Sequence, residues 1–272
     1  MTVELVSEVL SGDDRLLMVV GNYGCGKTEI AVNLAIQLSR AGRTVQIADL
    51  DIVNPYFRCR EARRLMEAHQ IRVVVPPGAQ AWADLPIILP EIAGMLAPPE
   101  GVISIFDVGG DEVGARALAS FRTRVREGSY QLWQVINAKR PFTNTVEGCL
   151  EMRQAIETSS RLTITGLLVN SHLMEDTTAG VVLEGWRLAC DVSRRSKVPV
   201  RGVAVIEELA DSRGLGAVTA PLLRLTRHML PPWMKPQPDE DLLPAARPAP
   251  LGKPPATTLP GTVGEMHGKN QD

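Results

Sequence analysis

The chain has 272 residues, with 29 lysines and arginines against 31 aspartates and glutamates, so its formal net charge is −2. This near balance excludes a chain-wide positive charge that would attract nucleic acid or an anionic membrane. No stretch approaches the roughly 18–20 apolar residues of a membrane-spanning helix, and the first residues lack a basic segment followed by an apolar core. We therefore expect a cytoplasmic protein without a secretory signal.

From residue 16 to residue 205, short apolar runs alternate with longer segments of helical periodicity. The runs are almost continuously apolar, which is typical of strands buried on both faces of a parallel sheet. The predicted strands cover residues 16–20, 44–48, 71–75, 102–106, 132–136, 163–169 and 200–205. The predicted helices cover residues 27–40, 56–69, 86–96, 112–126, 142–159 and 180–197, with a last short helix at about 216–230. This alternation predicts a three-layer α/β fold, with a mostly parallel, seven-stranded sheet and helices on both faces.

Proline divides the chain into two parts. Of the 20 prolines, ten lie between Pro231 and Pro260. Proline removes backbone donors, and the residues after 230 contain few large apolar side chains to offset the entropy of ordering. We therefore predict one folded domain over residues 1–230 and a disordered, Pro-rich tail over residues 231–272, with a proline-rich docking segment as the alternative for the tail.

The first predicted strand ends in a glycine-rich loop, G-N-Y-G-C-G-K-T at residues 21–28, and a predicted helix follows at once. This is the phosphate-binding pattern G-x-x-x-x-G-K-[ST] of P-loop NTPases, in which backbone N–H groups and a helix N-terminus converge on phosphate. Lys27 is the predicted catalytic cation at the β- and γ-phosphates, and the Thr28 hydroxyl is a predicted Mg²⁺ ligand. The predicted nucleotide-binding residues of this loop are Gly21, Gly24, Cys25, Gly26, Lys27 and Thr28. The dinucleotide fingerprint G-x-G-x-x-G is absent here, which argues against a nicotinamide or flavin enzyme.

Two carboxylates follow the second predicted strand, where a parallel sheet presents its carboxyl ends to a ligand. Alternation along the strand puts Asp49 and Asp51 on the same side. One can support Mg²⁺ and the other can orient the attacking water, so both are predicted metal-site residues and Asp51 is also a predicted catalytic residue. The alternative is that one of the two only caps the next helix or turn.

The fourth predicted strand ends in Asp107, after five residues V-I-S-I-F, in a Walker B pattern. Asp107 is predicted to hold Mg²⁺ through water. Gly109 and Gly110 follow, and Gly110 is predicted to offer a backbone amide to the γ-phosphate. The segment is therefore a candidate switch loop.

These motifs together resemble the MinD/ParA-like branch of P-loop ATPases, the deviant Walker A group that includes the nitrogenase iron protein, over about residues 15–210. The stretches DLDIVNPYFRCREARRL and KRPFTNTVEG are similar to a subgroup of MinD-like ATP-binding proteins. The resemblance implies bound Mg-ATP and a homodimer formed face to face around two nucleotides. Aligned on Lys27, the trans-acting lysine of that family falls at Asn22. The second cation that phosphoryl transfer needs then has three open candidates, Arg58, Arg60 and Arg140.

The sixth predicted strand is followed by Asn170, Ser171 and His172. In relatives an Asn at this place contacts adenine, so the resemblance makes Asn170 a predicted nucleotide-binding residue. Its amide can pair with a donor and an acceptor on the purine edge. A strand-end turn is the alternative role. The guanine-reading motif N-K-x-D is absent, which favours ATP over GTP.

The sequence therefore predicts a Mg-ATP-binding ATPase that acts as a nucleotide-dependent switch or maturation factor on an unidentified protein partner, with slow hydrolysis. Residues 54–56 and 141–144 flank the expected nucleotide face and are candidates for the surface that a partner contacts. Two alternatives stay open. One is an ATP-dependent small-molecule synthetase or kinase of the dethiobiotin or cobyrinate synthase type, and the other is a DNA-positioning ParA-like ATPase.

Neither DNA nor a membrane is an expected partner. The basic residues near Arg58 and Arg122 are interspersed with glutamates, which is more typical of solvated helix faces than of a nucleic-acid surface. Residues 221–230 could form a membrane-binding amphipathic helix, but so short a segment with only two arginines is expected to pack on the core instead.

Overall fold

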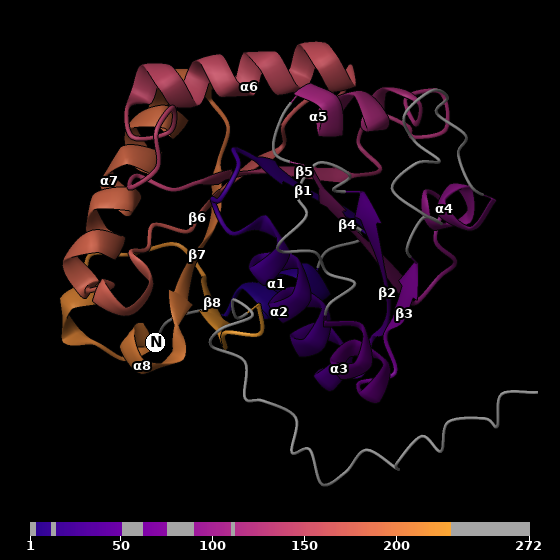
Figure 1. The fold of residues 1–272 in the computed structure, drawn as a ribbon, viewed down its shortest axis with the longest axis horizontal. Coiled ribbons are helices and arrows are strands. Elements are labelled where there is room, and N and C mark those ends of the chain that lie inside the picture. Colours follow the sequence, from indigo (N-terminus) through magenta and orange to yellow (C-terminus); the bar gives the residue numbers. More distant parts are fainter. Residues whose placement is uncertain (1–3, 12–14, 51–61, 75–89, 110–111, 230–272) are drawn as a thin grey trace, which may run out of the picture. The chain divides into compact units, whose positions relative to one another are not determined.

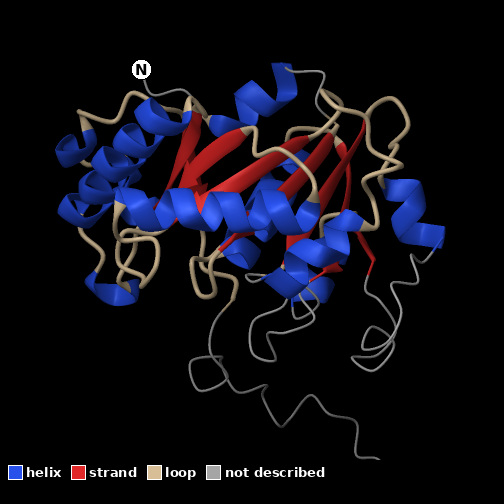
Figure 2. Ribbon diagram, turned by 90° about the horizontal axis from the view of Figure 1, so that it is seen from above, coloured by secondary structure: helices blue, strands red, loops and turns tan. Residues whose placement is uncertain are grey.

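A parallel eight-stranded sheet forms the centre of the molecule, and helices cover both of its faces (Figure 1 and Figure 2). The computed structural model describes residues 4–11, 15–50, 62–74, 90–109 and 112–229, all within one compact unit, Met1–Met234. The spatial order of the strands is β3-β2-β4-β1-β5-β6-β7-β8. The expected α/β class is confirmed, with one strand more than predicted.

The strands are β1 Leu16–Gly21, β2 Thr44–Leu50, β3 Arg72–Val74, β4 Val102–Val108, β5 Gln131–Ile136, β6 Gly166–Val169, β7 Val200–Ile206 and β8 Leu222–Leu225. The helices are α1 Leu5–Ser11, α2 Lys27–Arg40, α3 Arg63–Ala68, α4 Pro90–Met95, α5 Glu112–Ala119, α6 Val146–Ser160, α7 Ala179–Ser196 and α8 Glu207–Ala210. Two short 3₁₀ helices, η2 Met174–Asp176 and η3 Arg213–Leu215, lie in the later connections.

The sheet is buried on both faces, which explains why its strands read as continuous apolar runs. All six residues of β1 are buried. Met18 and Phe106 belong to the core cluster that includes residues of α5, α6 and α7. Val19 and Ile105 belong to the other cluster, which includes residues of α2 and α3. Successive residues of one strand therefore serve two different cores.

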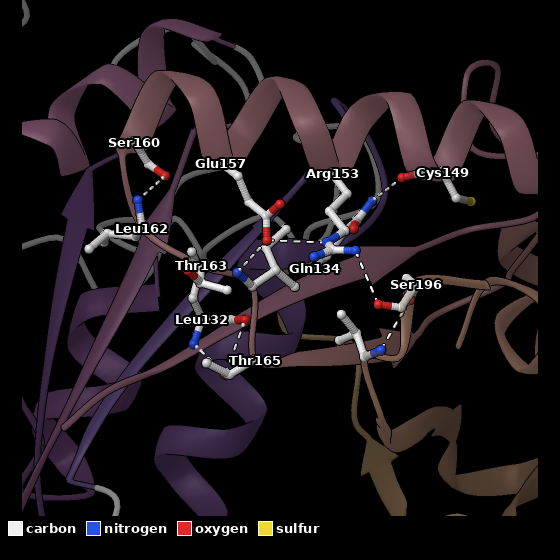
Figure 3. Close-up of polar contacts among 12 residues, drawn as sticks. Leu132, Gln134, Cys149, Arg153, Glu157, Ser160, Leu162, Thr163, Thr165 and Ser196 are labelled. Atoms are coloured by element: carbon white, nitrogen blue, oxygen red, sulfur yellow. Dashed lines mark hydrogen bonds and ion pairs between the residues drawn. The ribbon is translucent and has the colours of Figure 1, made fainter. Parts of the chain in front are cut away.

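Polar contacts fix α6 to the sheet and to α7 (Figure 3). The buried Gln134 of β5 donates from Nε2 to the carbonyl oxygen of Cys149 at 3.0 Å. Glu157 accepts the backbone N–H of Ile164 at 2.9 Å, and Arg153 donates to the carbonyl oxygen of Ser196 at 3.3 Å. These bonds fix the helix that follows the loop after β5, and this loop contributes to the candidate site described below.

All seven predicted strands are confirmed, but the predicted helix at 216–230 is wrong. Its centre is β8, an edge strand that pairs in parallel with β7. Leu222 and Leu223 are both buried, on opposite faces, while Arg224 forms ion pairs with Glu4, Glu207 and Asp211. Arg224 and Arg227, three positions apart among leucines, resemble the polar face of a helix. In the structure, Arg224 instead forms ion pairs with three carboxylates at the edge of the sheet. The hypothesis of a membrane-binding helix at 221–230 is therefore also wrong.

Other helices differ from the prediction at their ends. α1 was not expected; Leu5 is buried in it, and Glu4 bridges to Leu222 of β8. α6 begins at Val146 rather than at residue 142, because the Thr145 hydroxyl caps it by accepting the N–H of Gly148 at 3.1 Å. α5 ends at Ala119 rather than at residue 126.

The predicted helices 56–69 and 86–96 contain α3 and α4, and the first parts of these predictions lie outside the described residues. The predicted tail, 231–272, lies outside them as well. Within the part of the chain that the structure describes, no helix is long and apolar enough to cross a membrane.

Candidate nucleotide-binding site

The phosphate loop joins β1 to α2 and has a backbone that requires glycine. Gly24 and Gly26 have φ values of 70° and 91°, in the left-handed region that glycine favours. At Gly21, an added Cβ would lie 2.8 Å from the carbonyl oxygen of Val135 on the neighbouring strand. α2 begins directly after Gly26, so its free N–H groups and its positive dipole end face the loop. The predicted geometry of a phosphate cradle is thus present.

Lys27 and Thr28, the first residues of α2, both face inward. Lys27 is only 5% exposed, and its Nζ donates to the carbonyl oxygen of Asn22 at 3.1 Å, so the ammonium group lies over the loop. The Thr28 hydroxyl donates to Oδ2 of Asp107 at 2.7 Å. The residues proposed for the phosphate and for Mg²⁺ are therefore side by side, although 79 positions separate Thr28 from Asp107.

Asp49 and Asp107 lie next to each other at the carboxyl ends of β2 and β4. The parallel register pairs the two residues directly, and both are buried. Hydroxyl and carboxylate oxygens are the ligands that Mg²⁺ prefers, so Thr28, Asp49 and Asp107 fit this ion chemically. No group of three His, Cys, Asp or Glu side chains among the described residues could hold a metal by itself. A Mg²⁺ ion here would take its remaining ligands from nucleotide phosphates and water, as is usual for this ion.

Asn170 connects the end of β6 to the phosphate loop. Its Nδ2 donates to the carbonyl oxygen of Cys25 at 2.8 Å, and the side chain is buried. A Cβ added to Gly26 would lie only 2.1 Å from this nitrogen. Asn170 thus lies at the site, as expected from the sequence, and braces the loop from β6. Its contact with adenine stays a prediction.

Several predicted site residues lie outside the described residues. These are Asp51, Gly110, Arg58 and Arg60. The predicted roles of Asp51 as a catalytic and metal-site residue, and of Gly110 at the γ-phosphate, stay predictions. The other candidate cation, Arg140, is described and lies at the site.

A cavity of about 390 Å³ adjoins the phosphate loop. Its lining includes Gly24, Gly26, Lys27 and Thr28 on one side and residues that follow β5, β6 and β8 on the others. Three cationic side chains lie along it, Lys27, Arg140 and Arg227. A cavity with this charge and with the helix N-terminus favours an anionic ligand.

The segment after β8 forms one wall of this cavity, which the sequence analysis did not predict. Glu29 accepts the backbone N–H groups of His228 and Met229 at 2.8 and 3.0 Å. Asn33, one turn further along α2, exchanges two hydrogen bonds of 2.9 Å with the backbone of Thr226. Burial raises the pKa of Glu29, while the two N–H donors oppose that rise. The signal in the sequence was a row of polar side chains spaced four positions apart on α2, Glu29, Asn33 and Gln37.

Two further titratable groups at the site are held in their neutral forms. Burial raises the pKa of the Cys25 thiol, although the nearby Lys27 lowers it. The thiol therefore stays protonated and acts as a small buried side chain. Burial, together with the positive charges of Arg140 and Arg227, lowers the pKa of His172 to about 4.

The low pKa of His172 predicts a specific dependence of stability on pH. The folded protein resists protonation of His172 between its ordinary pKa of 6.5 and about 4, whereas the unfolded chain takes up the proton. Stability from this group is therefore complete above pH 6.5 and is lost as the pH falls towards 4. The wild type should lose unfolding free energy between pH 7 and pH 4.5. In His172→Gln this loss should be about 2 kcal/mol smaller, as measured by urea denaturation.

The matched control for this experiment is His69→Gln, a substitution at the residue after α3 that is outside the lining of the cavity. It should change the pH dependence of stability less than His172→Gln does. An equal flattening in both variants, or none in His172→Gln, would contradict the burial of a neutral His172 beside two arginines.

No family model matches the sequence, and no curated protein matches it. Solved structures do match. Cell division protein FtsY from Thermotoga maritima is 18% identical, with a TM-score of 0.51, over 74% of this chain and 68% of that chain. FtsY from Elizabethkingia anophelis in complex with GDP is 17% identical, with a TM-score of 0.48, over 74% and 63%.

The signal recognition particle 54 kDa protein from Aeropyrum pernix in complex with GDP is 20% identical, with a TM-score of 0.48, over 71% of this chain. The match spans only 42% of that protein's length. The similarity to Thermotoga FtsY shows a shared α/β fold. In this chain the phosphate-loop motif lies between β1 and α2 of that fold. The chain therefore has the fold of a P-loop NTPase.

Proposed function

We propose that the chain binds Mg-ATP and acts as a nucleotide-dependent switch or maturation factor on a protein partner, in the MinD/ParA-like branch of P-loop ATPases and with slow hydrolysis. The observation that carries the proposal is the hydrogen bond of 2.7 Å between Thr28 and Asp107, beside the buried Lys27. This bond connects the phosphate loop and α2 to the carboxylate at the end of β4, beside a cavity lined by cationic side chains. We further propose a cytoplasmic protein, with the nucleotide-binding domain over residues 1–230 and a Pro-rich tail over residues 231–272.

Each part of the site has a distinct task in this proposal. Backbone N–H groups of the loop that contains Gly24 and Gly26 bind phosphate oxygens, and Lys27 neutralises charge on the β- and γ-phosphates. Thr28 and Asp107 would hold Mg²⁺, directly and through water, with Asp49 beside them. When bound, the ion neutralises charge that develops on the phosphates. Asp51 would orient the attacking water.

The residues after β6, where the nucleotide base is expected, support ATP rather than GTP. The residues after β6 are Asn170, Ser171, His172 and Leu173, so Leu173 takes the place of the aspartate in the guanine-reading pattern N-K-x-D. A leucine side chain, here 44% exposed, offers no acceptor for the N–H groups of guanine. The GDP in the FtsY and signal recognition particle structures is a property of those proteins.

The connection between β4 and α5 supports a switch. Asp107 leads directly to Gly109, and a Cβ added to Gly114 of α5 would lie 2.4 Å from the carbonyl oxygen of Gly109. The first turn of α5 therefore packs against the backbone next to the metal-site carboxylate. A change at Asp107 can be transmitted to α5 by this close contact.

Exposed apolar side chains at the carboxyl edge of the sheet support a protein partner. Among the described residues, three large apolar side chains are exposed, Tyr23 at 58%, Phe142 at 72% and Leu173 at 44%. They belong to the phosphate loop, the loop after β5 and the loop after β6, which all lie at the carboxyl edge of the sheet. Exposed apolar side chains around a nucleotide site are suited to contact a partner that reads the nucleotide state.

The test of this function is the binding of fluorescently labelled ATP and GTP with Mg²⁺, followed by ATP turnover. We expect ATP to bind more tightly than GTP, because residue 173 offers no carboxylate to the N–H groups of guanine and the predicted contact of Asn170 would favour adenine. Leu173→Asp should reduce the difference between the two affinities. Gln154→Asp, at an exposed position of α6, is the control for the added charge. Equal affinity for both nucleotides in the wild type would overturn the preference for ATP.

Turnover is then measured alone, with DNA, with small-molecule acceptors and with proteins that copurify with the chain. Slow turnover that only a copurifying protein accelerates is the expected result. Turnover that only DNA or a small-molecule acceptor accelerates would replace the proposal with one of the two alternative functions. A failure to bind any nucleotide would overturn it entirely.

A further inference from the structure

Arg140 lies against the middle of the phosphate loop, although it belongs to a different loop. It follows β5, which pairs with β1 on the side opposite to β4. The guanidinium carbon and Nε of Arg140 both lie 3.6 Å from the position that a Cβ on Gly24 would take. The side chain also lines the cavity, together with Lys27. A second positive charge is thus placed where phosphates are expected.

The loop that carries Arg140 is held rigidly. The carbonyl oxygen of Asn137 accepts the N–H of Arg140 at 3.1 Å and the hydroxyl of Thr143 at 2.9 Å, and both Asn137 and Thr143 are fully buried. The N–H of Ala138 donates to Oγ of Ser171, after β6, at 2.9 Å. A cation on a loop with these bonds is preorganised, so little entropy is lost when it binds a ligand.

Asn22 connects this loop directly to the phosphate loop. Its Nδ2 donates to the carbonyl oxygen of Pro141 at 2.8 Å, next to Arg140 in the chain. Its Oδ1 accepts the N–H of Tyr23 at 2.8 Å, which fixes the orientation of the amide. Asn22 therefore sets the distance between Arg140 and the loop that contains Gly24.

Two neighbouring cations, Lys139 and Arg227, form ion pairs with carboxylates, and Arg140 forms none with the described residues. Lys139 pairs with Glu184, and Arg227 pairs with Glu175 at 2.7 Å. Glu29, the carboxylate that lines the cavity, accepts main-chain N–H groups instead. The positive charge of Arg140 also contributes to the low pKa of His172. Arg140 thus keeps its five N–H donors available to a ligand in the cavity.

We propose that Arg140 is a phosphate-binding residue, a second cation that contacts the nucleotide phosphates beside Lys27, and that Asn22 positions it through Pro141. This inference rests on the proposed function, because it assigns a residue to the same nucleotide site. The planar guanidinium binds two phosphate oxygens at once, which a lysine at the same place could not do.

The test compares Arg140→Gln, Arg140→Lys and the control Lys139→Gln by titration with labelled ATP and ADP. We expect Arg140→Gln to weaken binding about 10- to 100-fold, because charge-assisted hydrogen bonds are lost. Arg140→Lys should recover part of the loss, and Lys139→Gln should stay within about twofold, as a surface ion pair contributes little. The affinity of Arg140→Gln should also depend less steeply on salt than that of the wild type. Its thermal unfolding without nucleotide should stay within about 2 °C.

The positioning role of Asn22 has a separate test, a double-mutant cycle. Asn22→Ala should weaken ATP binding several-fold in the wild type and have almost no effect once Arg140 is glutamine. Additive losses would overturn the positioning role. Wild-type affinity in Arg140→Gln, or an equal loss in Lys139→Gln, would overturn the role of Arg140. If the wild type binds nucleotide, Lys27→Ala does not, and Arg140→Gln keeps wild-type affinity, only the inference on Arg140 fails; if the wild type binds no nucleotide, the proposed function fails first.

Discussion

Lys27→Ala is expected to weaken the binding of ATP about 100-fold and to abolish turnover, since two charge-assisted hydrogen bonds of about 1.5 kcal/mol each are lost. Lys27 is buried at the start of α2, and its Nζ is held over the loop by the carbonyl oxygen of Asn22. This carbonyl fixes the ammonium group before a nucleotide arrives, so the affinity depends strongly on this one side chain. Isothermal titration with ATP and Mg²⁺ measures the change directly.

The control for this variant is Lys139→Ala, which removes a positive charge near the cavity but breaks only an ion pair with Glu184 at the surface. It should bind ATP as the wild type does. Circular dichroism must show that Lys27→Ala keeps its α/β fold. Retained affinity in a folded Lys27→Ala protein would mean that the loop at residues 21–28 is not the phosphate site.

Gly26→Ala is expected to have the largest effect on the fold of the site, with a loss of about 3 kcal/mol in the free energy of unfolding. The added Cβ would lie 2.1 Å from Nδ2 of Asn170, and the φ of 91° is itself strained for alanine. The side chain of Asn170 must then move, which breaks its buried hydrogen bond to Cys25. Nucleotide affinity should fall as well, because this bond braces the loop.

Gly42→Ala is the control that shows how much of the effect at Gly26 comes from the contact with Asn170 and how much from backbone strain. Gly42, after α2, has a similar φ of 83°, and nothing lies within 4 Å of an added Cβ. Urea denaturation should therefore give a loss of only about 1 kcal/mol for Gly42→Ala. The double variant Gly26→Ala with Asn170→Ala should lose less than the sum of the two single variants, since the clash is absent. Equal losses at Gly26 and Gly42 would contradict the close contact with Asn170.

Local patterns were sufficient for seven of the eight strands and for the phosphate loop. A strand buried on both faces reads as a continuous apolar run wherever it lies in the sheet, so all seven runs were recognised. The loop was recognisable because its glycines, Lys27 and Thr28 are neighbours in the chain, and their geometry depends on only a few φ and ψ angles. The carboxylates could be placed at strand ends for the same reason.

Long-range packing decided the features that the sequence did not predict. The helical pattern at 216–230 proved to be β8, since Leu222 and Leu223 find buried places beside β7 and Arg224 meets three carboxylates. The wall formed by residues 226–229 depends on bonds from Glu29 and Asn33, about 190 to 200 positions away. Residues 226–229 carry no signal of these contacts, and the spacing of the polar side chains on α2 does not identify their distant partners.

By itself, the sequence determined that this protein has alternating strands and helices, a phosphate loop and carboxylates at strand ends, since each of these follows from residues close together in the chain. Only the tertiary structure decided which strands are neighbours, and with it that Asp49 lies beside Asp107, that Asn170 braces Gly26 and that Arg140 rests against Gly24. The physical reason is that strand order and register arise from the burial of all faces at once, a property of the assembled sheet and not of any one segment.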